Sequence, residues 1–320
     1  MNLSKTRIFF ATDIHGSEKC FRKFVNAGRF YKADVLILGG DITGKLFIPI
    51  MKHQNGFYTT HLLGEDCTMR SDNELEEIKK RIRSIGYYPY VSDGRGIKEL
   101  EKDSSKKDEV FSALMRESVG RWVKIAEERL KGTGIRCFIS PGNDDRYDID
   151  PFLEKSDYVV NPEGKVVFID DLHEVISCGC ANITPWECPR DLPEEELEEK
   201  IEAMTSRVTD MKNCIFNMHC PPYGTNIDQA PKLDENMKPI LQPGGGTEMT
   251  PAGCKSVSRA IEKYQPLLGL HGHIHESRGF VKLDRTLCIN PGSEYSEGIL
   301  RGFLVDLKDD GISDYMFTTG

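Results

Sequence analysis

The stretch RIFFATDIHG, residues 7–16, is the part of the sequence from which the fold can be predicted. It contains an apolar run typical of a buried β-strand, and Asp13 follows that run almost directly. Ser17 then provides an N-cap for a helix, and DVLILGGDITG, residues 34–44, is a second apolar run, followed by Asp41. Strand, helix and strand in about 30 residues form a βαβ unit, so we expect a parallel pair of strands.

The composition indicates a soluble globular protein. With 320 residues, of which 38% are hydrophobic and 29% charged, the chain is long enough to bury a large core. The apolar run Ile8 to Ala11 is too short for a signal peptide or a membrane span, so we expect a cytoplasmic protein without a membrane partner. Ten scattered cysteines without a CxxC pair are then best interpreted as reduced thiols.

The charge limits the partners. A net charge of -9 disfavours nucleic acid as a general partner, although a local groove could still be positive. An acidic protein that acts on an anionic substrate needs cations of its own at the site.

The middle of the chain changes character. We expect one domain over residues 1–320, with a helical insertion at 45–131 that has few β-like runs and many charges. Two amphipathic helices are predicted there, one ending at Gly86 and one between Val110 and Leu130. The stretches TTHLLGEDC and GYYPYVSDGRG are interpreted as irregular loops of the insertion.

Three later apolar runs are also followed by side chains that can bind a metal. IRCFISPGNDD leads to Asn143, CIFNMHC to His219, and LLGLHGHIHES to His273 and His275. In open sheets, ligands gather beyond the carboxyl ends of the strands, so these residues can converge with Asp13. Each motif alone has an ordinary alternative, because Asp, Asn and Gly are common in turns and a single histidine is often a packed core residue. The ordered set is much more specific than its members.

The set resembles the signature of the calcineurin-like, dinuclear metallophosphoesterases, which reads DxH, GD, GN(H), H and GHxH. The matching residues are Asp13-Ile14-His15, Gly40-Asp41, Gly142-Asn143, His219 and Gly272-His273-Ile274-His275. NPGS, residues 290–293, is similar to a piece that follows GHxH in the smaller prokaryotic members. The resemblance implies an α/β fold, a four-layer αββα sandwich of two mixed β-sheets flanked by helices.

The resemblance also implies a ligand set for two divalent metal ions. Asp13, His15 and His275 would hold one ion, Asn143, His219 and His273 the other, and Asp41 would bridge them. Carboxylate, amide and imidazole ligands suit Mn²⁺, which we expect, and also Fe²⁺ or Zn²⁺. A hydroxide shared by the two ions would attack phosphorus, so the expected partner is a small phosphoester substrate.

One position departs from the family pattern. The histidine that usually follows Asn and protonates the leaving group is replaced by Asp144. A carboxylate beside two cations has a lowered pKa and is a poor general acid, a role worth about 10²- to 10⁴-fold in rate. We therefore expect hydrolysis of phosphodiesters, activated phosphate esters or pyrophosphates in preference to phosphomonoesters.

Three further residues are candidates for catalysis or substrate binding. His271, directly before GHxH, is either a substitute acid, a residue that supports a ligand, or a strand-packing histidine. Arg146 and Tyr223 follow ligand-bearing turns and are candidates for contact with phosphate or leaving group, because guanidinium matches phosphate geometry.

Two alternative functions stay open. One is a catalytically silent binding scaffold with the same fold, a role that the missing histidine keeps open. The other is a nuclease, which would need a basic track, yet residues 45–131 mix both signs of charge. A protein Ser/Thr phosphatase is disfavoured by the same missing histidine. The natural substrate and the oligomeric state do not follow from the sequence.

Overall fold

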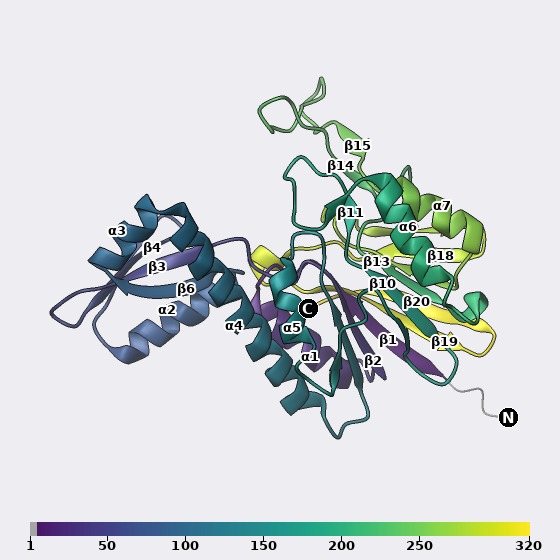
Figure 1. Cartoon of the computed structure of the whole chain (residues 1–320), viewed down its shortest axis with the longest axis horizontal. Coiled ribbons are helices and arrows are strands. Elements are labelled where there is room, and N and C mark those ends of the chain that lie inside the picture. Colours follow the sequence, from purple (N-terminus) through teal and green to yellow (C-terminus); the bar gives the residue numbers. More distant parts are fainter. Residues whose placement is uncertain (1–4) are drawn as a thin grey trace.

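The computed structural model describes residues 5–320 and contains two six-stranded mixed sheets (Figure 1). The first sheet has the order β20-β19-β1-β2-β7-β8, and the second has the order β17-β18-β16-β13-β10-β9. The first sheet is formed by β1 (Thr6–Ala11), β2 (Val35–Gly39), β7 (Arg136–Ser140), β8 (Val159–Val160), β19 (Arg301–Lys308) and β20 (Gly311–Thr319). The second is formed by β9 (Val166–Phe168), β10 (Glu174–Cys178), β13 (Ile215–Met218), β16 (Leu268–Leu270), β17 (Gly279–Leu283) and β18 (Thr286–Asn290).

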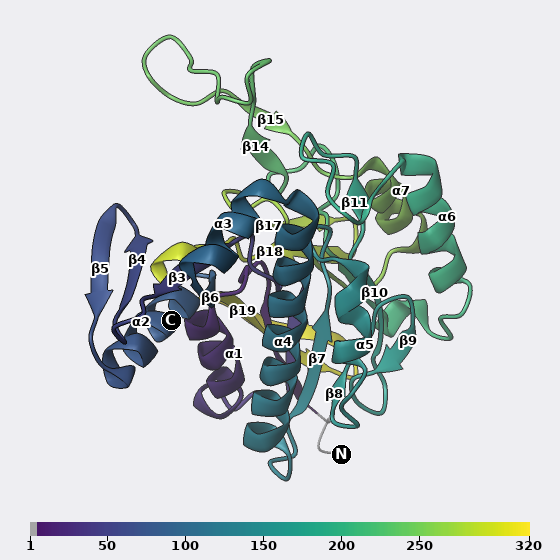
Figure 2. The ribbon, with the colours of Figure 1, turned by 60° about the vertical axis from the view of Figure 1, so that its left-hand side comes forward.

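Alternation along β1 separates two cores. Ile8 and Phe10 share a buried cluster with Ile215 of the second sheet, whereas Phe9 belongs to a cluster with Trp122 and other helical residues. The helices that pack on the sheets are α1 (Glu18–Phe30), α4 (Ser104–Leu130), α5 (Asp150–Leu153), α6 (Glu194–Thr205) and α7 (Lys255–Tyr264). Figures 1 and 2 show α6 and α7 together, well away from α1 and α4. The protein is a mixed α/β protein, and this packing is consistent with a sandwich.

The parallel strands explain where the site forms. β1 pairs with β2 in parallel, from Ile8 opposite Val35 to Ala11 opposite Leu38, which confirms the predicted βαβ unit. β2 and β7 are also parallel, as are β10, β13, β16 and β18 in the second sheet. Within each sheet the loops after these strands therefore leave from one edge.

The segment predicted as a helical insertion also contains a sheet, and the expectation of irregular loops there was wrong. β3 (Phe47–Lys52), β4 (Tyr58–Leu62), β5 (Glu65–Met69) and β6 (Tyr88–Asp93) form a four-stranded sheet, joined by α2 (Asp72–Ser84) and α3 (Gly94–Lys102). Leu63 and Gly64 at the tip of the β4–β5 hairpin have positive φ, so TTHLLGEDC turns tightly between two strands. The lobe has its own small core, which includes Ile50, Leu62 and Ile82.

Helix α4 connects this lobe to the body. Its middle and C-terminal residues Met115, Val119 and Trp122 pack into the core beside α1, although they fall inside the predicted insertion. Two short ribbons complete the fold: β11 (Ala181–Asn182) with β12 (Asp191–Leu192), and β14 (Gln229–Pro231) with β15 (Met249–Pro251). Within residues 5–320, none of the helices combines the length and apolar character that a membrane span requires.

Candidate metal centre

The first group of candidate ligands comes from the loops after β1 and β16. One ligand atom each of Asp13, His15 and His275 lies within 4.8 Å of the others. The Nε2 atoms of His15 and His275 are 3.0 Å apart, and His275 Nε2 is 3.4 Å from Asp13 Oδ1. These three residues are thus brought together from opposite ends of the chain.

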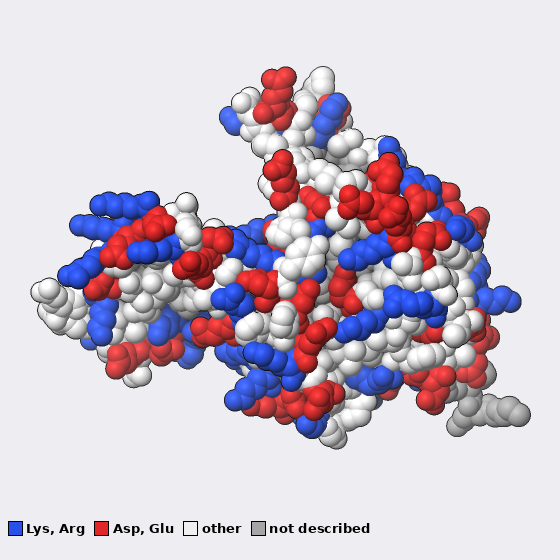
Figure 3. All heavy atoms as spheres, in the orientation of Figure 1, with Lys and Arg blue, Asp and Glu red and all other residues white. Residues whose placement is uncertain are grey.

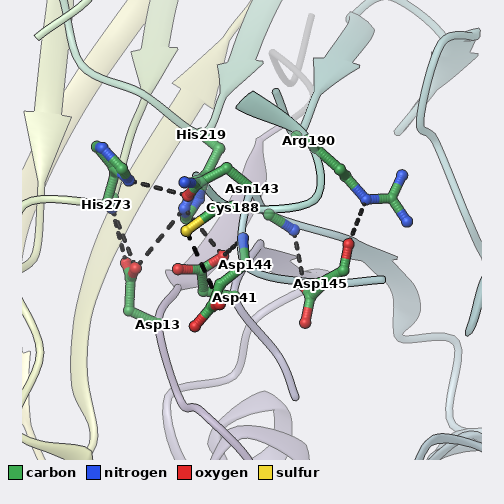
Figure 4. Close-up of polar contacts among 12 residues, drawn as sticks. Asp13, Asp41, Asn143, Asp144, Asp145, Cys188, Arg190, His219 and His273 are labelled. Carbon is green, nitrogen blue, oxygen red and sulfur yellow. Dashed lines mark hydrogen bonds and ion pairs between the residues drawn. The ribbon is translucent and has the colours of Figure 1, made fainter. Parts of the chain in front are cut away.

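The second group lies beside the first. Ligand atoms of Asp41, His219 and His273 again lie within 4.8 Å of one another, and Asn143 Oδ1 is 2.9 Å from His273 Nδ1 (Figure 4). Asp41 faces both groups, because its Oδ1 is 3.3 Å from His219 Nε2 and its Oδ2 is 3.6 Å from His15 Nε2. The structure therefore brings together all seven residues of the predicted ligand set.

The backbone at these positions is strained. Four of the seven candidates have a positive φ: Asp13 (52°), His15 (36°), Asp41 (47°) and His273 (66°). Such a conformation is uncommon outside glycine and costs about 1–3 kcal/mol per residue. It persists where the surrounding structure enforces it, which is typical of functional sites.

Two glycines of the motifs allow the loops to approach the carboxylates. A Cβ atom at Gly142 would overlap with the backbone nitrogen and carboxylate of Asp41, and one at Gly272 would overlap with the carboxylate of Asp13. Only glycine fits such close approach of backbone to side chain. The glycines of GN and GHxH are therefore needed for packing of the site itself.

The donor atoms fit divalent cations. His219 Nδ1 lies 3.1 Å from the Gly39 carbonyl, to which it donates, and its buried Nε2 has no hydrogen-bond partner within the described residues. That Nε2 faces the carboxylates of Asp41 and Asp13, at 3.3 and 3.8 Å. A second nitrogen held by a carbonyl fixes the tautomer of a metal-binding histidine. Imidazole, amide and carboxylate groups match a first-row divalent ion.

Burial controls the pKa values of the histidines in the metal-free protein. It lowers the pKa of His15 to about 3 and that of His273 to about 4, so both rings are neutral. Burial also acts to lower the pKa of His219, but the charges of Asp41 and Asp13 outweigh it and raise that pKa to about 10. A metal ion bound by His219 would displace its proton.

Asp191 supports the site, a role that sequence reasoning did not predict. Its Oδ1 accepts a hydrogen bond from Asn143 Nδ2 over 2.8 Å. Its Oδ2 accepts from the backbone nitrogens of Thr184 and Cys188, over 2.9 and 3.0 Å. Asp191 therefore orients the Asn143 amide with its oxygen toward His273. The residue follows no long apolar run, so the strand-end pattern could not identify it.

Asp145 ties the loops after β2 and β7 together. Its buried carboxylate accepts from the backbone nitrogens of Gly142, Ile42 and Thr43, over 2.7, 3.0 and 2.8 Å. The fully buried Arg190 donates to the Asp145 carbonyl over 2.7 Å, as Figure 4 shows.

The NPGS segment, residues 290–293, is hydrogen-bonded to the loops that carry Asp13 and the GHxH motif. Asn290 Nδ2 donates to the carbonyl of Ile274, between the two histidines of GHxH, over 2.9 Å. Ser293 Oγ donates to the Asp13 carbonyl over 2.6 Å. The segment therefore positions the backbone of the first group.

Asp144 lies at the edge of the site, next to two residues that sequence reasoning missed. Its Oδ2 is 3.7 Å from His15 Nδ1 and 3.2 Å from the ammonium nitrogen of Lys45. Burial, followed by the charge of Asp41, raises the pKa of Asp144 in the metal-free protein. The ring of Tyr295 lies beside the candidate ligands, with its centre 4.7 Å from that of His15 and the two rings tilted.

The other predicted residues have different neighbours. His271 is fully buried, and its Nδ1 lies 2.8 Å from the Met218 carbonyl, as expected for a strand-packing histidine. Arg146 is turned toward α4, where it pairs with Asp108 over 2.6 Å. Tyr223 is 42% exposed, beneath the ammonium group of Lys255. Contact of these three with a substrate stays a prediction.

Comparisons with known proteins support the fold. No protein-family model matches the chain. An uncharacterized protein of Methanocaldococcus jannaschii is 29% identical over 153 residues, which is 47% of this chain and 61% of that relative's length. One crystal structure aligns with 98% of this chain and 99% of its own, with a TM-score of 0.58 and 15% identity. Another, of a Thermus thermophilus protein, aligns with 99% of each chain, with a TM-score of 0.55 and 14% identity.

Proposed function

We propose that the protein is a metal-dependent phosphodiesterase of the calcineurin-like metallophosphoesterase family, with the four-layer αββα fold of that family. The observation on which the proposal depends is the convergence of seven donor side chains, from loops after strands of both sheets, in the order of the family signature. Strained backbone at four of these residues supports a functional role for the cluster.

The proposed ligand set is the one that the geometry groups together. Asp13, His15 and His275 would hold one ion, Asn143, His219 and His273 would hold the other, and Asp41 would contact both. Two divalent ions, with Mn²⁺ preferred, would supply an activated water and neutralise charge on the phosphate. The protein residues fix the position of the phosphate between the two groups.

Lys45 is a cation at the edge of the site that the chain itself offers to an anionic substrate. Its side chain is 50% exposed, and its ammonium group reaches Asp144 at the edge of the site. Burial acts to lower the pKa of Lys45, but the charges of Asp144 and Asp41 outweigh it and raise that pKa, so the group is charged. Lysine binds phosphate oxygens as a point charge, and we assign this role to Lys45.

Diesters fit this site better than monoesters. The Asp144 carboxylate stands where the family histidine would donate a proton, and Lys45 holds it in an ion pair. A monoester dianion carries one more negative charge than a diester, so the carboxylate repels it more strongly. A diester with a good leaving group needs no proton donor.

A nuclease is disfavoured by the surface charge. Figure 3 shows Lys and Arg interspersed with Asp and Glu over the insertion lobe on the visible face, without a continuous basic track. Binding of a nucleic-acid backbone needs clustered cations. Small organic phosphodiesters are therefore the proposed substrates.

The test is hydrolysis by protein stripped with a chelator and reloaded with Mn²⁺, Fe²⁺ or Zn²⁺. We expect activity only with metal, and a kcat/KM for bis(4-nitrophenyl) phosphate at least about tenfold above that for 4-nitrophenyl phosphate. His219→Ala should lose metal and activity, whereas His61→Ala, an exposed histidine of β4, should retain both. Two bound ions without hydrolysis of any ester would instead identify a silent scaffold.

A further inference from the structure

The insertion lobe and α4 enclose a cavity of about 650 Å³ next to the candidate metal centre. Its walls come from the segment that enters β3, from α3, and from the N-terminal part of α4. The apolar residues that line it are Leu46, Phe47, Pro49, Ile97, Leu100 and Phe111. Cavities that bind small organic ligands are typically about 300–1,000 Å³ and mostly apolar, so this one is of suitable size.

The apolar wall is open to solvent. Leu46, which precedes Phe47 in the chain, is 40% exposed. It is not part of the buried core of the lobe. Exposed apolar surface that gathers in a hollow, unlike apolar side chains scattered singly, is typical of a binding site.

The cavity adjoins the candidate metal centre through Lys45. Lys45 lines it, and the ammonium group of Lys45 lies 3.2 Å from Asp144, whose carboxylate is 3.7 Å from His15. Asp108 also lines it and pairs with Arg146, three residues after Asn143. The lining residues Lys45 and Asp108 therefore stand at the border between the cavity and the loop that carries the candidate ligand Asn143.

The charges at the border favour an anion. Lys45, Lys102 and Lys107 line the cavity, against the carboxylates of Glu101 and Asp108, and Arg146 neutralises Asp108. Beside these charged groups, the rest of the wall consists mainly of the six apolar side chains, which favour contact with a hydrocarbon group. A hydrocarbon group attached to an anionic phosphate matches both features.

We infer that this cavity binds the apolar organic group of the substrate while the phosphate lies at the metal centre. The inference rests on the proposed function and specifies its substrate class: phosphodiesters with a large aryl or alkyl ester group. Lys45 stands at the junction and contacts the phosphate. The insertion thus acts as the specificity element of the enzyme.

The experiment compares diesters that share the 4-nitrophenolate leaving group and differ in the retained group: methyl, hexyl or 1-naphthyl. For the metal-loaded wild type we expect the kcat/KM of the 1-naphthyl or the hexyl ester to exceed that of the methyl ester at least about tenfold, mainly through KM. A kcat/KM that is higher for the 1-naphthyl ester than for the hexyl ester indicates an aryl substrate. A hexyl ester that is hydrolysed as efficiently as the 1-naphthyl ester indicates an alkyl chain.

Two variants, one in the segment before β3 and one in α3, test whether the retained ester group binds in this cavity. Leu46→Gln and Ile97→Gln should each reduce that ratio at least about fivefold, because they make the wall polar. Leu63→Gln is the matched control, since Leu63 is 64% exposed at a hairpin tip of the same lobe. It should leave the ratio unchanged. Metal content and thermal unfolding of each variant verify that the fold is intact.

The outcomes separate this inference from the proposed function. Hydrolysis with the same ratio in wild type and both wall variants would overturn the inference and leave the phosphodiesterase proposal standing. If no ester is hydrolysed, the phosphodiesterase proposal fails, and binding of methyl 1-naphthyl phosphate against dimethyl phosphate is measured by calorimetry. Tighter naphthyl binding that Leu46→Gln removes would support the cavity site on a silent scaffold, and equal binding would overturn it.

Discussion

The side-chain amide of Asn143 donates a hydrogen bond to the carboxylate of Asp191 over 2.8 Å, and its oxygen lies 2.9 Å from His273 Nδ1. The amide can therefore offer only its oxygen to the centre of the site. Hydrogen bonds of this kind fix the orientation of a ligand before the ion arrives, and their loss typically costs about 10- to 100-fold in metal affinity.

We predict that Asp191→Ala weakens binding of the Mn²⁺ ion that Asn143 would hold by about 10- to 100-fold, because the Asn143 amide becomes free to rotate. Asp191→Asn keeps one acceptor and should lose less. Metal affinity is measured by calorimetry, together with the unfolding of the metal-free protein. Equal affinity in Asp191→Ala and wild type would show that Asn143 needs no such support or is not a ligand.

Metal binding should stabilise the protein. The candidate ligands come from distant parts of the chain and meet only in the folded structure, so an ion binds the folded state in preference to the unfolded chain. At an ion concentration of 100 times Kd we expect about 2.7 kcal/mol of added unfolding free energy. His275→Ala should reduce this gain, as measured by urea unfolding with Mn²⁺ and with chelator. A stability that is indifferent to metal in the wild type would contradict the assignment.

Lys45→Met should lower kcat/KM for a diester by about 10- to 100-fold, since a hydrogen bond from a charged group contributes about 1.5–3 kcal/mol. Lys52→Met, an exposed lysine at the end of the strand β3 that follows Lys45, is the matched control and should have wild-type kinetics. Metal content distinguishes a direct role from damage to the centre. A normal rate in Lys45→Met would remove this residue from the substrate site.

The candidate ligand set was accessible to sequence reasoning because each member follows an apolar run, and parallel strands place such loops at one edge. Asp191 and Lys45 carry no such signal. Asp191 is 48 residues from Asn143 in sequence, and Lys45 reaches Asp144 from the start of the insertion. Their contacts depend on how the loops pack, which no local pattern encodes.

The sheet in the insertion was not predicted, for a similar reason. β5, with the sequence EDCTM, is mostly charged or polar and has only Met69 buried, so its alternation is weak. Its pairing with β4 depends on the hairpin turn at Leu63 and Gly64. α4 is one continuous helix of 27 residues that begins in the lobe and ends in the core, so no break in composition marks the boundary.

Asp144→His should supply the histidine that the calcineurin-like pattern has at this position. We expect turnover of an alkyl monoester to rise by about tenfold or more, because imidazole can protonate the leaving group near neutral pH. Asp144→Asn is the matched control, since it removes the same negative charge but offers no acid. Rates for alkyl monoester and nitrophenyl diester are compared. An equal gain in Asp144→Asn would show that charge repulsion, not proton donation, limits the wild type.

Asp170 links the two sheets, and its effect on stability should depend on pH. Its carboxylate accepts from Thr6 Oγ1 of β1 over 2.5 Å and from the backbone nitrogen and Nδ1 of His173 over 2.6 and 2.7 Å. Burial acts to raise the pKa of Asp170, but these hydrogen bonds outweigh it and hold the pKa well below the ordinary value. The ionised carboxylate therefore stabilises the folded state.

Asp170→Ala should lower the unfolding free energy of the metal-free protein by about 2 kcal/mol at pH 7. The folded pKa is lowered, so the contribution is complete above the unfolded pKa of about 3.9 and is lost as pH falls toward the folded value. The difference between wild type and variant should hence shrink between about pH 4 and pH 2 in urea unfolding. Asp171→Ala, at the exposed neighbouring position, should show little difference at any pH. A gap between wild type and Asp170→Ala that stays constant down to pH 2 would mean that the carboxylate charge contributes nothing to the contact between the sheets.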